Sequence, residues 1–213
     1  AKLIEEITYD EMLEMASSGA RVLMARSVEF GRRYNVPIIV KPTFSEGSGT
    51  IVKDKVMEQA IVSGVTHNDK EIKFTLFGVP DQPGIAGKVF GPLSENGVIV
   101  DMIVQNVSKE SKTDISFTAP LEQKSEVENI LENLSTELEA EGADSDPNIA
   151  RVSLIGAGMK AESGIASKMF SILGENKINI AMISTSPIRI SCVVNKDDMQ
   201  KAIDSLHKEF IEA

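Results

Sequence analysis

The stretch FTLFGVPDQPGIAGKVFGPLSENGVIVDMIVQN, residues 74–106, decides the fold because the chain uses it twice. The second copy, VSLIGAGMKAESGIASKMFSILGENKINIAMISTS, covers residues 152–186. With a shift of 80 positions the copies share several residues, among them Gly84/Gly164, Phe90/Phe170, Asn96/Asn176 and Met102/Met182. Two copies indicate a duplicated domain, because a solenoid needs three or more repeats.

Each copy has the same local pattern. In the first, the apolar run 74–77 predicts a buried strand that ends at Gly78. Apolar residues then recur at helical spacing from Gly84, and Gly97 suits a left-handed cap at the end of that helix. A strand is expected over 98–104. The second copy predicts the same elements at 152–155, Gly156, Gly164 and 178–183.

The flanks of the two copies also match. Residues 112–118 and 189–195 alternate as strands do, and residues 127–138 and 199–210 carry apolar positions at helical spacing. The order β-α-β-β-α therefore occurs twice. One more strand in each copy gives an α+β fold of two ferredoxin-like βαββαβ units, each with helices on one face of an antiparallel sheet.

The second copy lacks a closing strand, because the chain ends after its second helix. A spare strand is expected earlier, at 60–66, and we predict that it completes the second unit. The first domain, 71–148, is then inserted into a second domain made of 60–66 and 149–213. Residues 67–70 are expected to turn as a hairpin into the first repeat, and the acidic stretch 139–147 to be a break between the repeats.

Residues 1–53 are too few to bury an independent core. Thr8 to Glu11 form a capping-box pattern that opens a short helix. A second helix is expected over 22–34, a strand over 37–40, and a turn, not a phosphate loop, over 45–49. This region is expected to be the end of a larger domain.

The stretches GVPDQPGIAGKVF, DMIVQNVS, TDISFT, VSLIGAGMK, SGIASKMF and ISTSPIRIS together carry a resemblance. The chain resembles the C-terminal regulatory region of aspartokinase, which contains two ACT domains. The resemblance implies that residues 1–53 are the C-terminal remnant of an amino-acid-kinase α/β domain. Nothing in the chain resembles the family's Lys-Phe-Gly-Gly nucleotide-binding motif. ATP and magnesium would serve the full enzyme, and this chain would carry no cofactor.

The resemblance also implies function and partners. ACT domains of this family pair side by side, and lysine or threonine bind at their interfaces as feedback inhibitors of aspartate phosphorylation. We therefore expect a homodimer through ACT domains, with lysine and/or threonine as effector and a catalytic aspartokinase chain as partner.

The first candidate site is the loop before the first repeat's helix. A helix start leaves N–H groups unpaired and carries partial positive charge, which suits the carboxylate of an amino acid. Gly84 permits close approach, and Asp81 offers an acceptor for the ammonium group. The alternative reading is a plain turn and helix cap. The candidate effector-binding residues here are Asp81, Pro83, Gly84, Ile85, Ala86, Gln105, Asn106 and Ser108.

The matching loop of the second repeat is two residues longer and lacks the Asp-x-Pro-Gly pattern, so the two loops are not expected to be equivalent sites. Its candidate residues are Met159, Lys160, Gly164, Ile165, Ser184 and Thr185.

Composition excludes several classes of function. A net charge of −10 argues against nucleic-acid binding, and the aromatic signature of RNA-binding ferredoxin-like domains is absent. The single cysteine, Cys192, fits a small core residue, and His67 and His207 stand outside any metal-ligand pattern. Without a signal peptide or a run of ~20 apolar residues, a cytoplasmic protein is expected.

Three functions remain in competition. The first is a sensing, regulatory part of aspartokinase. The second is an assembly module that dimerises a kinase subunit without binding an effector. The third, a complete enzyme, is disfavoured because the chain shows no nucleotide site and no catalytic set of residues.

Overall fold

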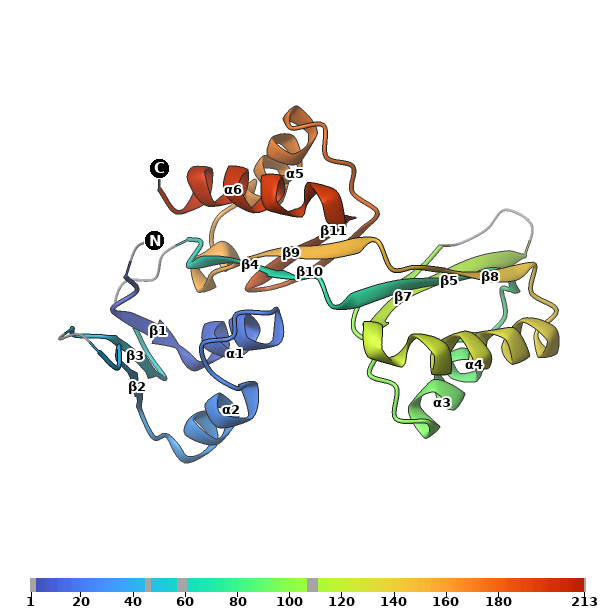
Figure 1. Ribbon diagram of the computed structural model, residues 1–213, viewed down its shortest axis with the longest axis horizontal. Coiled ribbons are helices and arrows are strands. Elements are labelled where there is room, and N and C mark those ends of the chain that lie inside the picture. The colour runs from blue at the N-terminus through green and yellow to red at the C-terminus, as the bar shows by residue number, and fades with distance from the viewer. Residues whose placement is uncertain (1–2, 45–46, 57–60, 107–110, 213) are drawn as a thin grey trace. The chain divides into compact units, whose positions relative to one another are not determined.

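The computed structural model describes residues 3–44, 47–56, 61–106 and 111–212 (Figure 1). The chain divides into two compact units. One unit is Asp69–Ala150, called the first repeat unit below. The other combines Ala1–Asn68 with Arg151–Ala213, and so joins the second repeat to the N-terminal segment.

The first repeat unit is a four-stranded antiparallel sheet whose strand order is β6-β7-β5-β8. Its sheet packs against two helices through one apolar core that includes Phe74, Phe117, Val89 and Leu131. The βαββαβ order of a ferredoxin-like unit is confirmed. Its elements are β5 (Glu71–Pro80), α3 (Ile85–Glu95), β6 (Ile103–Gln105), β7 (Lys112–Pro120), α4 (Lys124–Glu137) and β8 (Gly142–Asp146).

Three expectations for this unit are wrong. The acidic stretch 139–147 is not a break, because β8 lies within it and pairs with β5 as an edge strand. The first strand does not end at Gly78, since β5 continues to Pro80 through a bulge between Leu76 and Val79. Gly78 takes a φ of 60° there, and its N–H donates to Asp114 Oδ1 at 2.9 Å. The expected strand 98–104 begins only at Ile103.

The second repeat forms a sheet of order β10-β11-β9-β4, covered by two helices over a separate apolar core. The prediction that the early strand completes this sheet is confirmed, because β4 pairs antiparallel with β9 and places Val65 opposite Leu154. That strand begins at Gly64, and β4 and β5 lie in different sheets, so the expected hairpin is wrong. The elements are β4 (Gly64–Asn68), β9 (Ile149–Ile155), α5 (Ile165–Glu175), β10 (Met182–Ser186), β11 (Arg189–Asn195) and α6 (Met199–Phe210).

The N-terminal segment holds a three-stranded sheet of order β1-β3-β2 and two helices. The capping box at Thr8 and Glu11 is confirmed in both directions. Strands β1 and β3 were not expected, because each is short and has no alternating pattern of its own. The expected turn at 45–49 lies partly outside the described residues. The elements are β1 (Glu6–Thr8), α1 (Tyr9–Ser17), α2 (Ala25–Tyr34), β2 (Ile38–Val40) and β3 (Thr50–Lys53).

The N-terminal segment packs directly on the second repeat. Its small core contains Ile7, Met12, Val28 and Val52, and Ile155 at the end of β9 completes it. The last residue of β9 therefore belongs to the contact between the two parts of this unit.

Candidate functional site

The first loop, residues 79–84, is anchored at its base and open at its tip. Val79 is fully buried, whereas Asp81 and Gly84 are exposed. The N–H of Asp81 donates to the carbonyl of Ser111 at 2.8 Å, which ties the loop to the chain just before β7. This arrangement holds Asp81 at the surface beside the start of α3.

The start of α3 offers free donors. Gly84 is its N-cap residue with a φ of 89°, in the left-handed region that a residue with a side chain rarely adopts. A Cβ at Gly84 would meet nothing within 4 Å, so the backbone conformation, rather than crowding, calls for glycine here. Among the described residues, the N–H groups of Ala86 and Gly87 have no acceptor. Such groups, together with the helix dipole, bind carboxylates.

Ile85, expected to contribute to the effector site, does not offer a free N–H group to a ligand. Its N–H donates to the carbonyl of Gln82 at 3.2 Å, and its side chain is buried in the core. The N–H of Ile85 is therefore taken, whereas no described residue accepts from the N–H groups of Gly84, Ala86 and Gly87. Gly87 was missed by the sequence analysis. Pro83 is exposed in the turn that leads into the helix.

The fold brings the polar end of β6 to the same end of the sheet as the first loop. Strand β7 lies between β5 and β6 and runs antiparallel to both. Its first residues face Pro80 at the end of β5, and Ile115 faces Gln105 at the end of β6. Gln105 and Asn106 are exposed there, and Ser108 lies outside the described residues. The N–H groups at the start of α3, the carboxylate of Asp81 and the side-chain amides of Gln105 and Asn106 thus belong to the same end of the sheet.

The second loop, residues 156–164, is built differently. It contains one 3-10 turn, Ala157–Lys160, and leads into α5, whose N-cap Gly164 has a φ of 91°. Gly84 and Gly164 thus repeat one backbone conformation, but the loops before them differ. Met159 packs against the second core, Lys160 is exposed, and Ile165 is half-buried. Ser184 is half-buried and Thr185 exposed on β10.

A contact that the sequence analysis missed engages the second loop. The N–H of Ala157 donates to Glu11 Oε1 at 2.9 Å, and Glu11 belongs to α1 of the N-terminal segment. The sequence places Glu11 only in a capping box, and nothing in its pattern indicates a partner 146 positions away.

Burial alone would raise the pKa of Glu11. Hydrogen bonds from Ser63, Ala157 and Thr8 outweigh it, and the pKa of this carboxyl lies below its ordinary value of 4.5. Glu11 is therefore held as a carboxylate in the folded chain.

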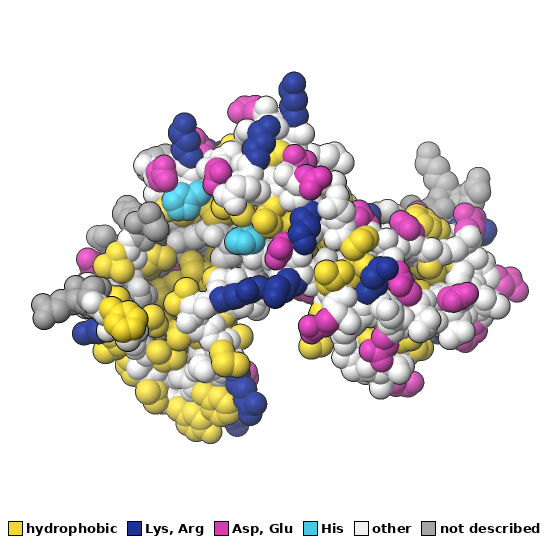
Figure 2. All heavy atoms as spheres, viewed as in Figure 1, with side chains coloured by type: hydrophobic (Ala, Val, Ile, Leu, Met, Phe, Trp, Pro, Cys, Tyr) yellow, Lys and Arg dark blue, Asp and Glu magenta, His cyan; other side chains and the backbone are white. Residues whose placement is uncertain are grey.

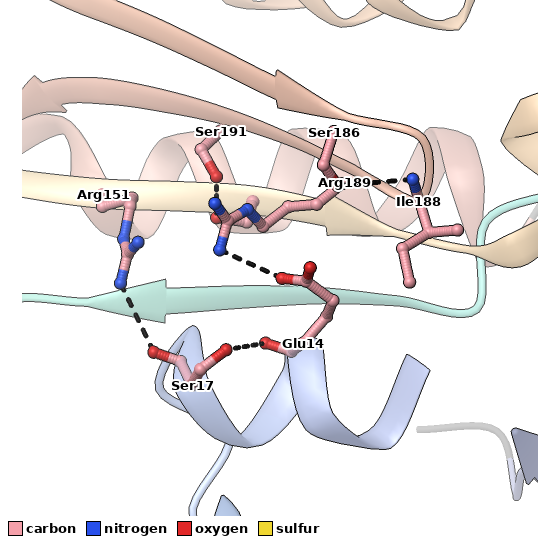
Figure 3. Close-up of polar contacts among 8 residues, drawn as sticks. Glu14, Ser17, Arg151, Ser186, Ile188, Arg189 and Ser191 are labelled. Atoms are coloured by element: carbon pink, nitrogen blue, oxygen red, sulfur yellow. Dashed lines mark hydrogen bonds and ion pairs between the residues drawn. The ribbon is translucent and has the colours of Figure 1, made fainter. Parts of the chain in front are cut away.

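Neighbouring polar contacts also join α1 to the second repeat (Figure 3). Arg189 Nη1 forms an ion pair with Glu14 Oε2 at 3.0 Å, and Arg151 donates to the carbonyl of Ser17 at 3.4 Å. Within the part of the chain that the structure describes, no group of His, Cys, Asp and Glu fits a metal ion. No described helix is long and apolar enough to span a membrane.

Comparison with known proteins identifies the family of the two repeats. Family comparison finds an ACT domain over residues 73–139 and another over residues 152–210. Aspartate kinase of Pseudomonas putida is 45% identical over 213 residues, which cover 99% of this chain and 52% of that protein. The regulatory subunit of Thermus thermophilus aspartate kinase, solved ligand-free, is 37% identical with a TM-score of 0.67; the match covers 70% of this chain and 99% of that subunit.

Escherichia coli aspartokinase III, solved with lysine and aspartate in its T-state, has a TM-score of 0.74 at 24% identity. That match covers 99% of this chain and 47% of the other, and it concerns the fold alone. The two repeat units are thus ACT domains, which places the chain among ACT-domain regulatory proteins. The chain belongs to the aspartokinase family and comprises the family's regulatory region with two ACT domains. It spans about half the length of the curated relatives it matches.

Proposed function

We propose that this chain senses lysine and/or threonine at an ACT-domain interface and thereby mediates feedback inhibition of aspartate phosphorylation. The observation that carries the proposal is the open start of α3, where the N–H groups of Ala86 and Gly87 have no acceptor among the described residues and the exposed Asp81 precedes the N-cap Gly84 by three residues. A free amino acid needs donors for its carboxylate and an acceptor for its ammonium group. Both are present at this one sheet end.

The side-chain amides at the end of β6 suit recognition of the ligand's own side chain. Gln105 and Asn106 are exposed at the end of β6, on the other side of β7 from the loop. Their amides can donate to a threonine hydroxyl or accept from a lysine ammonium group. The E. coli enzyme, which shares the fold, was solved with lysine, and an amino-acid effector for this chain agrees with that complex.

The catalytic reaction belongs, in this proposal, to residues outside this chain. The N-terminal segment exposes large apolar side chains, which Figure 2 shows gathered over it, and such a surface fits packing against the rest of a kinase domain. Those residues include Val22, Met24, Tyr34, Val36, Ile39 and Phe44. ATP, magnesium and aspartate would bind the catalytic part, and the isolated chain is expected to phosphorylate nothing.

One observation favours assembly as an accompanying role. The edge strands β6 and β10 carry Ile103 and Ile183 at equivalent repeat positions, and these side chains are 52% and 44% exposed. Exposed isoleucines on edge strands favour pairing with another ACT domain. A module that only assembles would show this feature and bind no amino acid.

Calorimetric titration separates sensing from assembly. Lysine, threonine and, as a control ligand, alanine are titrated into the chain, its Asp81→Asn variant and a Glu95→Gln variant. Glu95 is exposed at the opposite end of α3, so it matches Asp81 in charge but not in place. We expect lysine or threonine to bind, Asp81→Asn to weaken binding about ten- to a hundredfold, and Glu95→Gln to leave it unchanged. Absence of binding by all three amino acids contradicts sensing. Unchanged affinity in Asp81→Asn would move the site to Met159 and Lys160.

A further inference from the structure

The carboxylate of Glu11 joins three segments of the chain. It is buried, with 3% of the residue exposed, and each of its oxygens has its own set of donors. Oε2 accepts from the N–H and the hydroxyl of Thr8, at 3.3 and 2.7 Å, within the cap of α1. Oε1 accepts from the hydroxyl of Ser63 at 2.5 Å and from the N–H of Ala157 at 2.9 Å. One oxygen therefore holds the helix and the other holds the second ACT domain.

The backbone around this carboxylate is closely packed. A Cβ at Gly156 would lie 2.2 Å from the carbonyl oxygen of Ile61, and one at Gly64 would lie 2.8 Å from the Met15 side chain of α1. The N–H of Gly156 also donates to the carbonyl of Ile188 at 3.0 Å. The second loop, the turn between β10 and β11, and α1 are thus packed as one group.

The two ACT domains differ in this respect. The first loop donates its Asp81 N–H to Ser111 of its own domain, whereas the second loop donates its Ala157 N–H to a residue of the N-terminal segment. If Ala157 moves away, Oε1 loses a donor in a site shielded from water, and an under-satisfied buried carboxylate is costly. Loop and helix are therefore expected to move together.

We propose that Glu11 is a positioning residue that couples the second loop, through the N–H of Ala157, to α1 and thereby carries the state of the second ACT domain to the N-terminal segment. The inference rests on the proposed function, in which the ACT domains sense an amino acid and the N-terminal segment belongs to the kinase part. It adds the residue through which the two communicate.

Hydrogen exchange measured by mass spectrometry tests the contact itself. Peptides covering α1 and residues 157–163 are followed in the wild-type chain and in Glu11→Ala, Glu11→Gln, Ser63→Ala and Asp10→Ala. Asp10 is the matched control, since it neighbours Glu11 on α1 but forms an exposed ion pair with Arg32. Glu11→Ala should speed exchange at 157–163 about ten- to a hundredfold, and Asp10→Ala should not. Ser63→Ala should act in the same direction but less, and Glu11→Gln should restore part of the protection.

Should Glu11→Ala fail to fold, Ser63→Ala decides the question, because it leaves the cap of α1 intact. Unchanged exchange at 157–163 in a folded Glu11→Ala would show that Glu11 is only a helix cap and would overturn the proposal. If only Ser63→Ala folds, unchanged exchange in that variant has the same meaning.

The coupling is tested by adding lysine and threonine separately. In the wild-type chain the bound amino acid should change exchange in α1. In Glu11→Ala, or Ser63→Ala as its substitute, it should bind with similar affinity but change α1 less. A purely structural role would weaken α1 in both states equally, and an undiminished response of α1 would overturn the proposal. If neither amino acid binds, the proposed function fails, and the exchange comparison without ligand still decides whether Glu11 holds the second loop.

Discussion

Lys177 occupies in the second ACT domain the position that Gly97 occupies in the first, and both have a left-handed backbone, with φ of 59° and 71°. Each follows the cap of the first helix of its domain, and its N–H donates to a carbonyl three residues earlier, at 2.9 Å for Lys177 and 3.0 Å for Gly97. Glycine adopts this conformation freely, whereas a residue with a Cβ is strained by roughly 1–2 kcal/mol.

The substitution Lys177→Gly should therefore stabilise the second ACT domain. Part of the relieved strain is offset by the greater freedom of glycine in the unfolded chain, so a gain of about 1 kcal/mol is expected. Urea unfolding monitored by circular dichroism measures it, with Gly97→Lys as the reverse change, expected to destabilise by a similar amount. A loss of stability in Lys177→Gly would show that contacts of the lysine side chain outweigh the strain.

Stability should depend on pH through Glu11. Its folded pKa lies below the ordinary value of 4.5, since hydrogen bonds to the charged form outweigh burial. The carboxylate's contribution is therefore fully present above pH 4.5 and is lost as the pH falls through the folded pKa. Melting temperatures across the acid range should fall less steeply in Glu11→Gln than in the wild-type chain. Parallel curves would contradict the shift.

The sequence predicts the repeated parts of this fold well, because there the apolar pattern coincides with burial. Strands β7 and β11 and all four helices of the ACT domains lie where the spacing indicates them. Strand β8 escapes prediction because its sequence, Gly-Ala-Asp-Ser-Asp, has no apolar period; it is held by backbone pairing with β5 and by the bond from Ser145 to Glu128 on α4.

In the candidate site, too, some features follow from the local sequence and others depend on tertiary packing. The glycine at each helix start and the exposed Asp81 follow from local pattern, and the backbone conformations of Gly84 and Gly164 agree. Which backbone N–H groups at the start of α3 stay free depends on the turn at Gln82, and the spacing of residues in the sequence does not specify that turn. The bond between Glu11 and Ala157 depends on tertiary packing between distant segments, so no local pattern predicts it.

Cys192 should be unreactive in the folded chain. Its side chain is fully buried in the second core, and burial raises the pKa of the thiol to about 12. Because the thiolate is the reactive form, a thiol reagent at pH 8 should modify Cys192 at least about a hundredfold faster in denaturant than in native buffer. Modification at equal rates would contradict this burial.

The chain should associate through its edge strands. Ile103 and Ile183 lie exposed at matching positions on β6 and β10, and a lysine at either place adds a charge where two edges would meet. Light scattering at tens of micromolar should give at least a dimer for the wild-type chain and a lower mass for Ile103→Lys. The exposed Ile99, which precedes β6, supplies a control in Ile99→Lys. A wild-type monomer, with and without effector, would refute the prediction.

Crystals of the chain grown with lysine or threonine test most directly whether the first ACT domain binds an amino acid at the start of α3. We expect electron density for a zwitterion whose carboxylate accepts from the N–H groups of Ala86 and Gly87 and whose ammonium group donates to Asp81. Density for the amino acid only beside Met159 and Lys160, or none at saturating concentration, would contradict it.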